Sequence, residues 1–100
     1  MQLITDELRQ TLPPLYSQEH EPDPLVRVKY FTPDSSWTWY VLEFDGDDLF
    51  FGLVDGQEEE LGYFTLHELQ TVRGPFGLAI ERDLYFEPCP LSAVRRCPRR

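Results

Sequence analysis

Residues 37–56, WTWYVLEFDGDDLFFGLVDG, decide the fold of this chain. The stretch contains two apolar runs, each about as long as one strand, on either side of a short acidic turn with Asp45 and Gly46. Aromatic and β-branched residues favour strands, and Asp-Gly between two such runs is the strongest local signal of a hairpin. The stretch therefore predicts two antiparallel strands joined by a tight turn.

The expected loop of this hairpin, Asp45–Asp48, determines which residues face each other. A tighter turn would set Glu43 opposite Asp48, and like charges directly opposed disfavour it. Paired residues point to the same side of a sheet, so one side should hold only the apolar pairs Phe44–Leu49, Leu42–Phe51 and Tyr40–Leu53. We expect this side to be buried. The other side is mixed and should be only partly covered; it carries Trp39, Val41, Glu43, Phe50, Gly52 and Val54.

Two short helices are expected outside the hairpin. Thr5 can cap the first helix, because acidic residues follow it where the helix dipole favours them, and Pro13 ends it. Thr65 and Glu68 have the spacing of a capping box, in which each side chain accepts a hydrogen bond from the other residue's amide. This pattern predicts the second helix, over residues 66–72.

Further strands are expected before and after the hairpin. Residues 25–31 alternate apolar and basic side chains, which predicts a strand with one wet face, and the turn residues 33–36 connect it to the hairpin. Glu58–Glu60 should form a solvated loop before a fourth strand over residues 61–64. Residues 84–86 are a short apolar run that predicts an edge strand or an extended segment.

These elements predict one α+β domain over residues 1–94, with an antiparallel meander sheet of four or five strands and two short helices. A chain of 100 residues fits a single domain. Residues 95–100 contain four arginines and should form a disordered basic tail. Cys89 and Cys97 are expected to be free thiols, because a core of this size needs no disulfide; a bridge or a metal pair is the alternative.

The charge of the chain is strongly negative and unevenly distributed. The net charge is −9, and four of the nine bases lie in the last six positions. Residues 43–68 contain nine acids and no Lys or Arg. Such a field repels nucleic acids and anionic membranes and attracts basic partners, although it also simply solubilises a small protein. No apolar run approaches the roughly 18 residues of a membrane span, and the acidic N-terminus does not resemble a secretory signal, so we expect a cytoplasmic protein.

The candidate binding surface consists of carboxylates on and beside the hairpin. Trp39 and Phe50, on the mixed side of the hairpin, are candidate aromatic contacts, although core packing is the simpler explanation for aromatic residues. The turn acids could instead hold a hard cation, but their spacing does not match a calcium loop. We expect no catalytic residue, no cofactor and no specific metal site. The carboxylates of the candidate surface are Glu43, Asp45, Asp47, Asp48, Asp55, Glu58, Glu59 and Glu60.

Six motifs follow one another along the chain: LPPLY (12–16), YFTP (30–33), WTWY (37–40), EFDGDDLFFGLVDG (43–56), ELGYF (60–64) and RGPFGLAIERDLYFEPCPLS (73–92). In this order they resemble the domain of unknown function 2958 family of short bacterial proteins. The resemblance covers about residues 3–94 and leaves the C-terminal arginines outside. It implies a setting on plasmids and integrative elements, and it implies no activity and no catalytic residue.

We therefore expect a non-enzymatic interaction protein of mobile genetic elements. Its partner should be a basic, nucleic-acid-binding protein, and the sharpest form of this hypothesis is a counter-defence inhibitor, such as an anti-CRISPR or anti-restriction protein, that mimics nucleic acid. Direct binding of nucleic acid is not expected. The alternatives are a small metal-dependent enzyme or accessory factor that uses the turn carboxylates, and an accessory protein of plasmid maintenance or conjugation.

Overall fold

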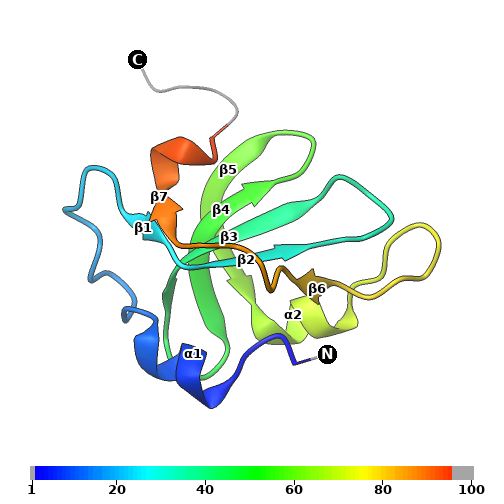
Figure 1. Cartoon of the computed structure of the whole chain (residues 1–100), viewed down its shortest axis with the longest axis horizontal. Helices are drawn as coiled ribbons and strands as arrows, with labels where there is room; N and C mark the ends of the chain where they lie inside the picture. The colour runs from blue at the N-terminus through cyan, green and yellow to red at the C-terminus, as the bar shows by residue number, and fades with distance from the viewer. Residues whose placement is uncertain (1, 96–100) are drawn as a thin grey trace.

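A twisted five-stranded antiparallel sheet forms the centre of the computed structural model, which describes residues 2–95 (Figure 1). Its strand order is β5-β4-β3-β2-β6, and the first four of these strands follow one another as a meander. The expectation of an α+β fold is confirmed. The bounds are β2 Val28–Phe31, β3 Thr38–Phe44, β4 Leu49–Asp55, β5 Glu59–Thr65 and β6 Glu81–Arg82.

Shorter elements lie on both sides of this sheet. In Figure 1 the two helices, α1 (Asp6–Thr11) and α2 (Leu66–Thr71), lie at its lower end. A second, two-stranded sheet lies at the upper left and pairs β1 (Leu25–Val26) with β7 (Cys89–Pro90). The 3-10 helix η1 (Leu91–Ala93) follows β7 directly. These elements cover different faces of the large sheet.

The β3–β4 hairpin forms as predicted, but its register changes in the middle. Tyr40 faces Leu53 as expected, whereas Glu43 faces Phe51 and Phe44 faces Phe50. The pairing shifts between Val41 and Glu43, as it does at a β-bulge, where one strand carries an extra residue. The predicted Phe44–Leu49 and Leu42–Phe51 pairs are therefore wrong, because the bulge moves Phe44 to the opposite side of the hairpin.

The larger core lies on the side of the hairpin that was expected to be only partly covered. Phe50 has 0% of its surface exposed, and Trp39 has 8%. The Phe50 ring packs against Phe44 at 4.4 Å and Phe64 at 5.3 Å between ring centroids. Tyr30 also belongs to this core, and its hydroxyl donates a 2.5 Å hydrogen bond to the carbonyl of Leu3. The expectation that the mixed side is only partly covered was wrong, because the N-terminal segment, α1 and α2 all supply apolar residues to it.

A second, smaller core covers the other side of the hairpin. It consists of Val26, Leu42, Leu53 and Leu91, with Phe51 only partly buried beside them. The predicted strand over residues 25–31 supplies both cores, because it breaks at Arg27 into β1 and β2. The two sides of the hairpin are therefore both buried, each by segments distant in the sequence.

The local signals for the helices are confirmed. The Thr5 side chain accepts a hydrogen bond from the Leu8 amide, and both bonds of the capping box between Thr65 and Glu68 are present. Two strand predictions need correction. Glu59 and Glu60 belong to β5 rather than to a loop, and the edge strand is β6 rather than residues 84–86.

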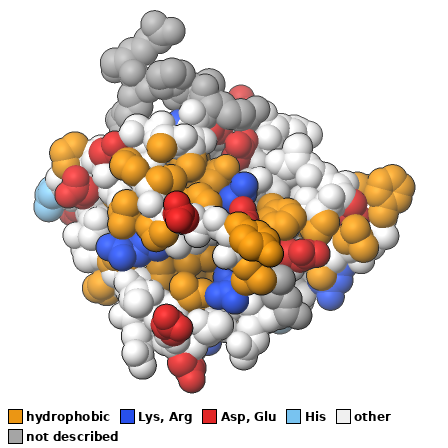
Figure 2. Space-filling model, viewed as in Figure 1, with side chains coloured by type: hydrophobic (Ala, Val, Ile, Leu, Met, Phe, Trp, Pro, Cys, Tyr) orange, Lys and Arg blue, Asp and Glu red, His pale blue; other side chains and the backbone are white. Residues whose placement is uncertain are grey.

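Residues 84–86 lie instead in a surface segment after β6. Leu84 is 62% exposed and Tyr85 is 93% exposed, at a turn of the chain, whereas Phe86 is partly buried against the second core beside Tyr40. Figure 2 shows hydrophobic side chains gathered over the middle of one face of the molecule, interrupted by acidic and basic ones. Cys89 is a free, half-buried cysteine in β7. Cys97 and the expected basic tail, apart from Arg95, lie outside the described residues.

Candidate functional site

Glu43 is a buried carboxylate that organises a loop, not a member of an exposed acidic surface. The β-bulge turns its side chain to the same side as Phe51, where only 4% of the residue is exposed. Its two oxygens accept hydrogen bonds from the backbone amides of Tyr16 and Gln18, each at 2.8 Å. Buried carboxylates require such donors, because an unpaired buried charge is costly. Glu43 therefore anchors the segment that follows α1.

The anchored segment, residues 14–21, is a succession of tight turns. The amides of Ser17, Glu19 and Glu21 each donate to the carbonyl three residues before, at 3.0 to 3.3 Å. Tyr16 has a φ of 69°, the left-handed region that non-glycine residues rarely adopt. This conformation aims the Tyr16 and Gln18 amides at one carboxylate, so Glu43 offsets the conformational cost.

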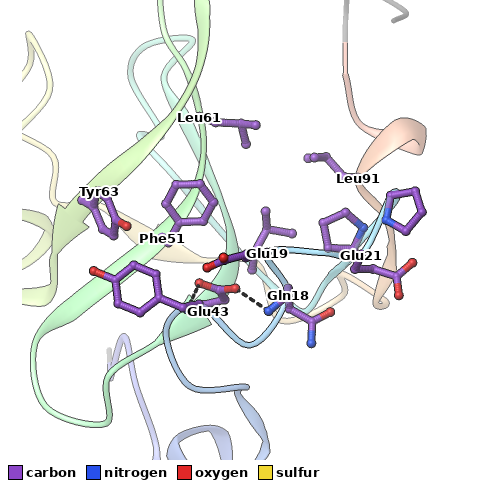
Figure 3. A pocket seen from close by; sticks show the side chains of 12 residues that line it. Gln18, Glu19, Glu21, Glu43, Phe51, Leu61, Tyr63 and Leu91 are labelled. Atoms are coloured by element: carbon purple, nitrogen blue, oxygen red, sulfur yellow. Dashed lines mark hydrogen bonds between the residues drawn. The ribbon is translucent and has the colours of Figure 1, made fainter.

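A cavity of about 390 Å³ lies between this segment and the β4–β5 part of the sheet (Figure 3). The sheet contributes apolar and aromatic side chains and the Glu43 carboxylate, and residues 16–24 contribute a tyrosine, an amide, two carboxylates and two prolines. Its lining contains three carboxylates and no Lys or Arg. The lining residues are Tyr16, Gln18, Glu19, Glu21, Pro22, Pro24, Leu42, Glu43, Phe51, Leu61, Tyr63 and Leu91.

Two tyrosines form the rim of this cavity. Tyr63 is 52% exposed and Tyr16 is 63% exposed, and Tyr63 packs against Phe51 with 5.0 Å between ring centroids. A hydrogen bond with the Tyr16 side chain raises the pKa of Tyr63, with smaller contributions from desolvation and from the charges of Glu43 and Glu19. The rim is thus aromatic and lies within the field of the cavity carboxylates.

The acids of the β3–β4 turn are largely engaged within the fold. The Asp45 carboxylate accepts hydrogen bonds from the amides of Asp47 and Asp48 at 2.8 Å and of Leu49 at 3.0 Å. Desolvation raises the pKa of Asp45, but these amide donors together lower it below its ordinary value. Asp48 accepts a hydrogen bond from the His67 amide at 2.9 Å, at the start of α2.

A base also reaches this turn from α1. Arg9 donates a hydrogen bond to the carbonyl of Gly46 at 2.6 Å, and its guanidinium lies 5.6 Å from the centre of the Phe44 ring. Residues 43–68 contain no Lys or Arg, but in the folded protein Arg9 lies beside their first turn. The negative charge of the β3–β4 turn is partly offset.

The remaining acids of the predicted surface lie at the opposite end of β4. Asp55 of β4 lies opposite Glu59 of β5 in the strand register, and the Glu58 and Glu60 side chains are exposed. The seven residues of β4 separate this group from the β3–β4 turn by about 20 Å. The structure therefore divides the eight predicted carboxylates into two turn groups and the buried Glu43.

The two predicted aromatic contacts are buried in the folded chain. Trp39 and Phe50 lie in the larger core and present almost no surface. Tyr16 and Tyr63 are accessible aromatic residues at the cavity, and Trp37, which is 42% exposed, lies against Gly56 at the β4–β5 turn. Alternation along β5 places Leu61 and Tyr63 on one side of the sheet and could have identified Tyr63. Nothing in the sequence indicated Tyr16, because its position depends on Glu43.

Residues 2–95 contain many His, Cys, Asp and Glu side chains of the types that bind metal ions. No group of three or more His, Cys, Asp or Glu side chains that could hold a metal ion occurs in this part of the chain. His20 lies 3.7 Å from Glu19 and is highly exposed, and His67 is exposed at the start of α2. Within the same residues, no helix has the length and apolar character that crossing a membrane requires.

Comparison with known proteins identifies a family and no activity. No curated protein and no solved structure matches the chain. A family model described as "Protein of unknown function (DUF2958)" matches residues 3–99. The match extends beyond the resemblance seen over residues 3–94 and includes Arg95, Arg96 and Arg99. Since it covers nearly the whole sequence, the chain belongs to the DUF2958 family.

Proposed function

We propose that this protein is a non-enzymatic interaction protein of mobile genetic elements that binds a basic protein surface. The partner is a nucleic-acid-binding protein. In the sharpest form of the proposal, the chain is a counter-defence inhibitor, such as an anti-CRISPR or anti-restriction protein, that occupies the nucleic-acid site of a CRISPR or restriction protein. The observation that carries the proposal is the acidic group at the β4–β5 turn, where Asp55, Glu58, Glu59 and Glu60 lie together with no base in the same stretch of sequence.

The distribution of charge around the sheet supports this proposal. Arg27, Lys29 and Arg82 lie on or beside β2 and β6, at the opposite edge of the sheet from β5. Lys29 there forms an ion pair with Asp83 at 3.7 Å. These three bases therefore lie away from the β4–β5 turn, where the Glu58 and Glu60 side chains are exposed. Exposed charges of this kind accelerate association with a basic partner and make it dependent on salt.

The test is capture of a partner, followed by binding kinetics. Tagged protein is used to capture proteins from a bacterial host that carries CRISPR and restriction systems, and the captured protein is identified and purified. Its association rate with the full chain should fall at least about tenfold between low and moderate salt, because screening removes electrostatic steering. DNA or RNA that the partner normally binds should compete with the chain.

Paired substitutions assign the effect to the β4–β5 turn. Glu58→Gln with Glu60→Gln removes two exposed charges there, and should slow association more than it accelerates dissociation. Glu81→Gln with Glu87→Gln removes two exposed charges elsewhere and is the matched control, which should have little effect. The proposal would be contradicted by a partner whose affinity does not change with salt and is the same for both double variants.

A further inference from the structure

We propose that the cavity rimmed by Tyr16 and Tyr63 binds an arginine side chain of the partner protein. This inference rests on the proposed function, because it assumes a basic partner, and it assigns recognition to a cavity rather than to the exposed acidic turn. The cavity contains both features that an arginine requires: carboxylates for the guanidinium and an apolar wall for the aliphatic part of the side chain.

The charge of the cavity is the first argument. Glu19, Glu21 and Glu43 line it, and none of its lining residues is Lys or Arg. Within residues 2–95, the ion pairs are Lys29–Asp83 and, where the histidine is protonated, His20–Glu19, and neither involves Glu43 or Glu21. The two amide donors satisfy Glu43 in part but supply no positive charge, so a ligand cation in this partly buried site would be attracted to the carboxylates. The complementary occupant is a cation.

The hydrogen bonding of Glu43 is the second argument. Each carboxylate oxygen accepts one amide hydrogen bond, from Tyr16 or Gln18, and each oxygen can accept about two. The remaining acceptor capacity lies beside the cavity, where Figure 3 shows the Glu43 carboxylate among the other lining side chains. A guanidinium presents several N–H donors in one plane and binds carboxylates with two parallel hydrogen bonds. An ammonium group cannot make this planar contact.

The aromatic wall is the third argument. The tilted rings of Phe51 and Tyr63 and the exposed ring of Tyr16 surround the mouth of the cavity. Guanidinium groups stack on aromatic faces and are more weakly hydrated than ammonium groups, so they lose less on entering such a site. Leu42, Leu61 and Leu91 provide contacts for the aliphatic part of the side chain. Arginine therefore fits this wall better than lysine does.

The test uses a peptide with a single arginine, acetyl-Gly-Ser-Arg-Gly-Ser-amide, and two matched peptides in which citrulline or lysine replaces the arginine. Titration of the isotopically labelled full chain is followed by amide NMR. The arginine peptide should cause saturable shifts of the Tyr16 and Gln18 amides. Citrulline has nearly the same shape without the charge and should bind at least about tenfold more weakly; lysine should bind several-fold more weakly. Equal binding of the arginine and citrulline peptides, or of the arginine and lysine peptides, would overturn the proposal.

Variants distinguish the cavity from the general acidic field. Glu19→Gln removes an exposed charge from the cavity lining, and Glu58→Gln removes an exposed charge from the β4–β5 turn. Glu19→Gln should weaken the arginine peptide about threefold to tenfold, whereas Glu58→Gln should leave its affinity nearly unchanged. Tyr63→Leu keeps an apolar residue and should also weaken it several-fold. Equal effects of Glu19→Gln and Glu58→Gln would refute the cavity and leave the acidic-surface proposal standing. If the cavity binds the arginine peptide but the capture experiment yields no basic partner protein, the proposed function fails and the arginine site remains.

Discussion

The backbone amide of Tyr16 donates a 2.8 Å hydrogen bond to Glu43, and Tyr16 adopts a left-handed φ of 69° to do so. This relationship joins the segment after α1 to the bulged strand β3. It forms one wall of the cavity and removes Glu43 from the exposed acidic surface.

The first prediction concerns this anchor. Glu43→Gln keeps the shape of the side chain but replaces one acceptor oxygen by an NH₂ group that would face an amide donor. Because a buried donor then loses its partner, the free energy of unfolding should fall by about 1–3 kcal/mol. Urea denaturation measures the change, and Glu60→Gln, at an exposed site in β5, is the control and should be nearly neutral. Equal losses in the two variants would mean that Glu43 does not anchor the loop.

The second prediction concerns the two adjacent phenylalanines of β4. Phe50 has 0% of its surface exposed and contacts three aromatic rings, whereas Phe51 is only partly buried at the cavity. Phe50→Ala should therefore lower the free energy of unfolding by about 3–5 kcal/mol, and Phe51→Ala by clearly less. Thermal or urea melts of both variants decide between them. A larger loss for Phe51→Ala would mean that the larger core lies on the Phe51 side of the hairpin instead.

The third prediction concerns two glycines that face each other across β4 and β5. A Cβ on Gly52 would lie 2.0 Å from the carbonyl oxygen of Tyr40, which is backbone and cannot move aside. A Cβ on Gly62 would meet nothing within 4 Å. Gly52→Ala should cost more than about 2 kcal/mol, because the β3–β4 ladder must separate, whereas Gly62→Ala should change stability by less than about 1 kcal/mol. Urea melts that show similar losses would contradict this steric argument.

The fourth prediction concerns the pH dependence contributed by Asp45. Amide donors hold its pKa below the ordinary value of 3.8 in the folded protein, against the opposing effect of desolvation. A carboxyl group whose pKa is lowered by folding stabilises the fold above its unfolded-state pKa. That contribution disappears as the pH falls through the folded-state pKa. Wild type should therefore be more stable than Asp45→Asn above about pH 5, and the difference should shrink as the pH falls below 3.8.

Urea melts of both proteins from acidic to neutral pH measure this difference. A gap in stability that stays constant over the whole range would show that Asp45 acts only as an uncharged acceptor. An increase of the gap on acidification would contradict the sign of the argument.

The sequence predicted the features that neighbouring residues control. The β3–β4 hairpin, the Thr5 cap and the Thr65–Glu68 capping box all form, because their hydrogen bonds join residues only a few positions apart. The α+β class follows from these local elements. The overall negative charge is likewise a property of composition alone.

Tertiary contacts decided which residues are buried and which are available. The bulge between Val41 and Glu43 reverses the side of Phe44, and packing from α1, α2 and the N-terminal segment selects that side for the larger core. The same bulge buries Glu43 beside Tyr16, 27 residues earlier in the chain. Arg9 reaches the acidic turn from α1. Periodicity within a strand cannot reveal these outcomes, because burial depends on which distant segments pack against each face, and so the cavity at Tyr63 exists only in the folded chain.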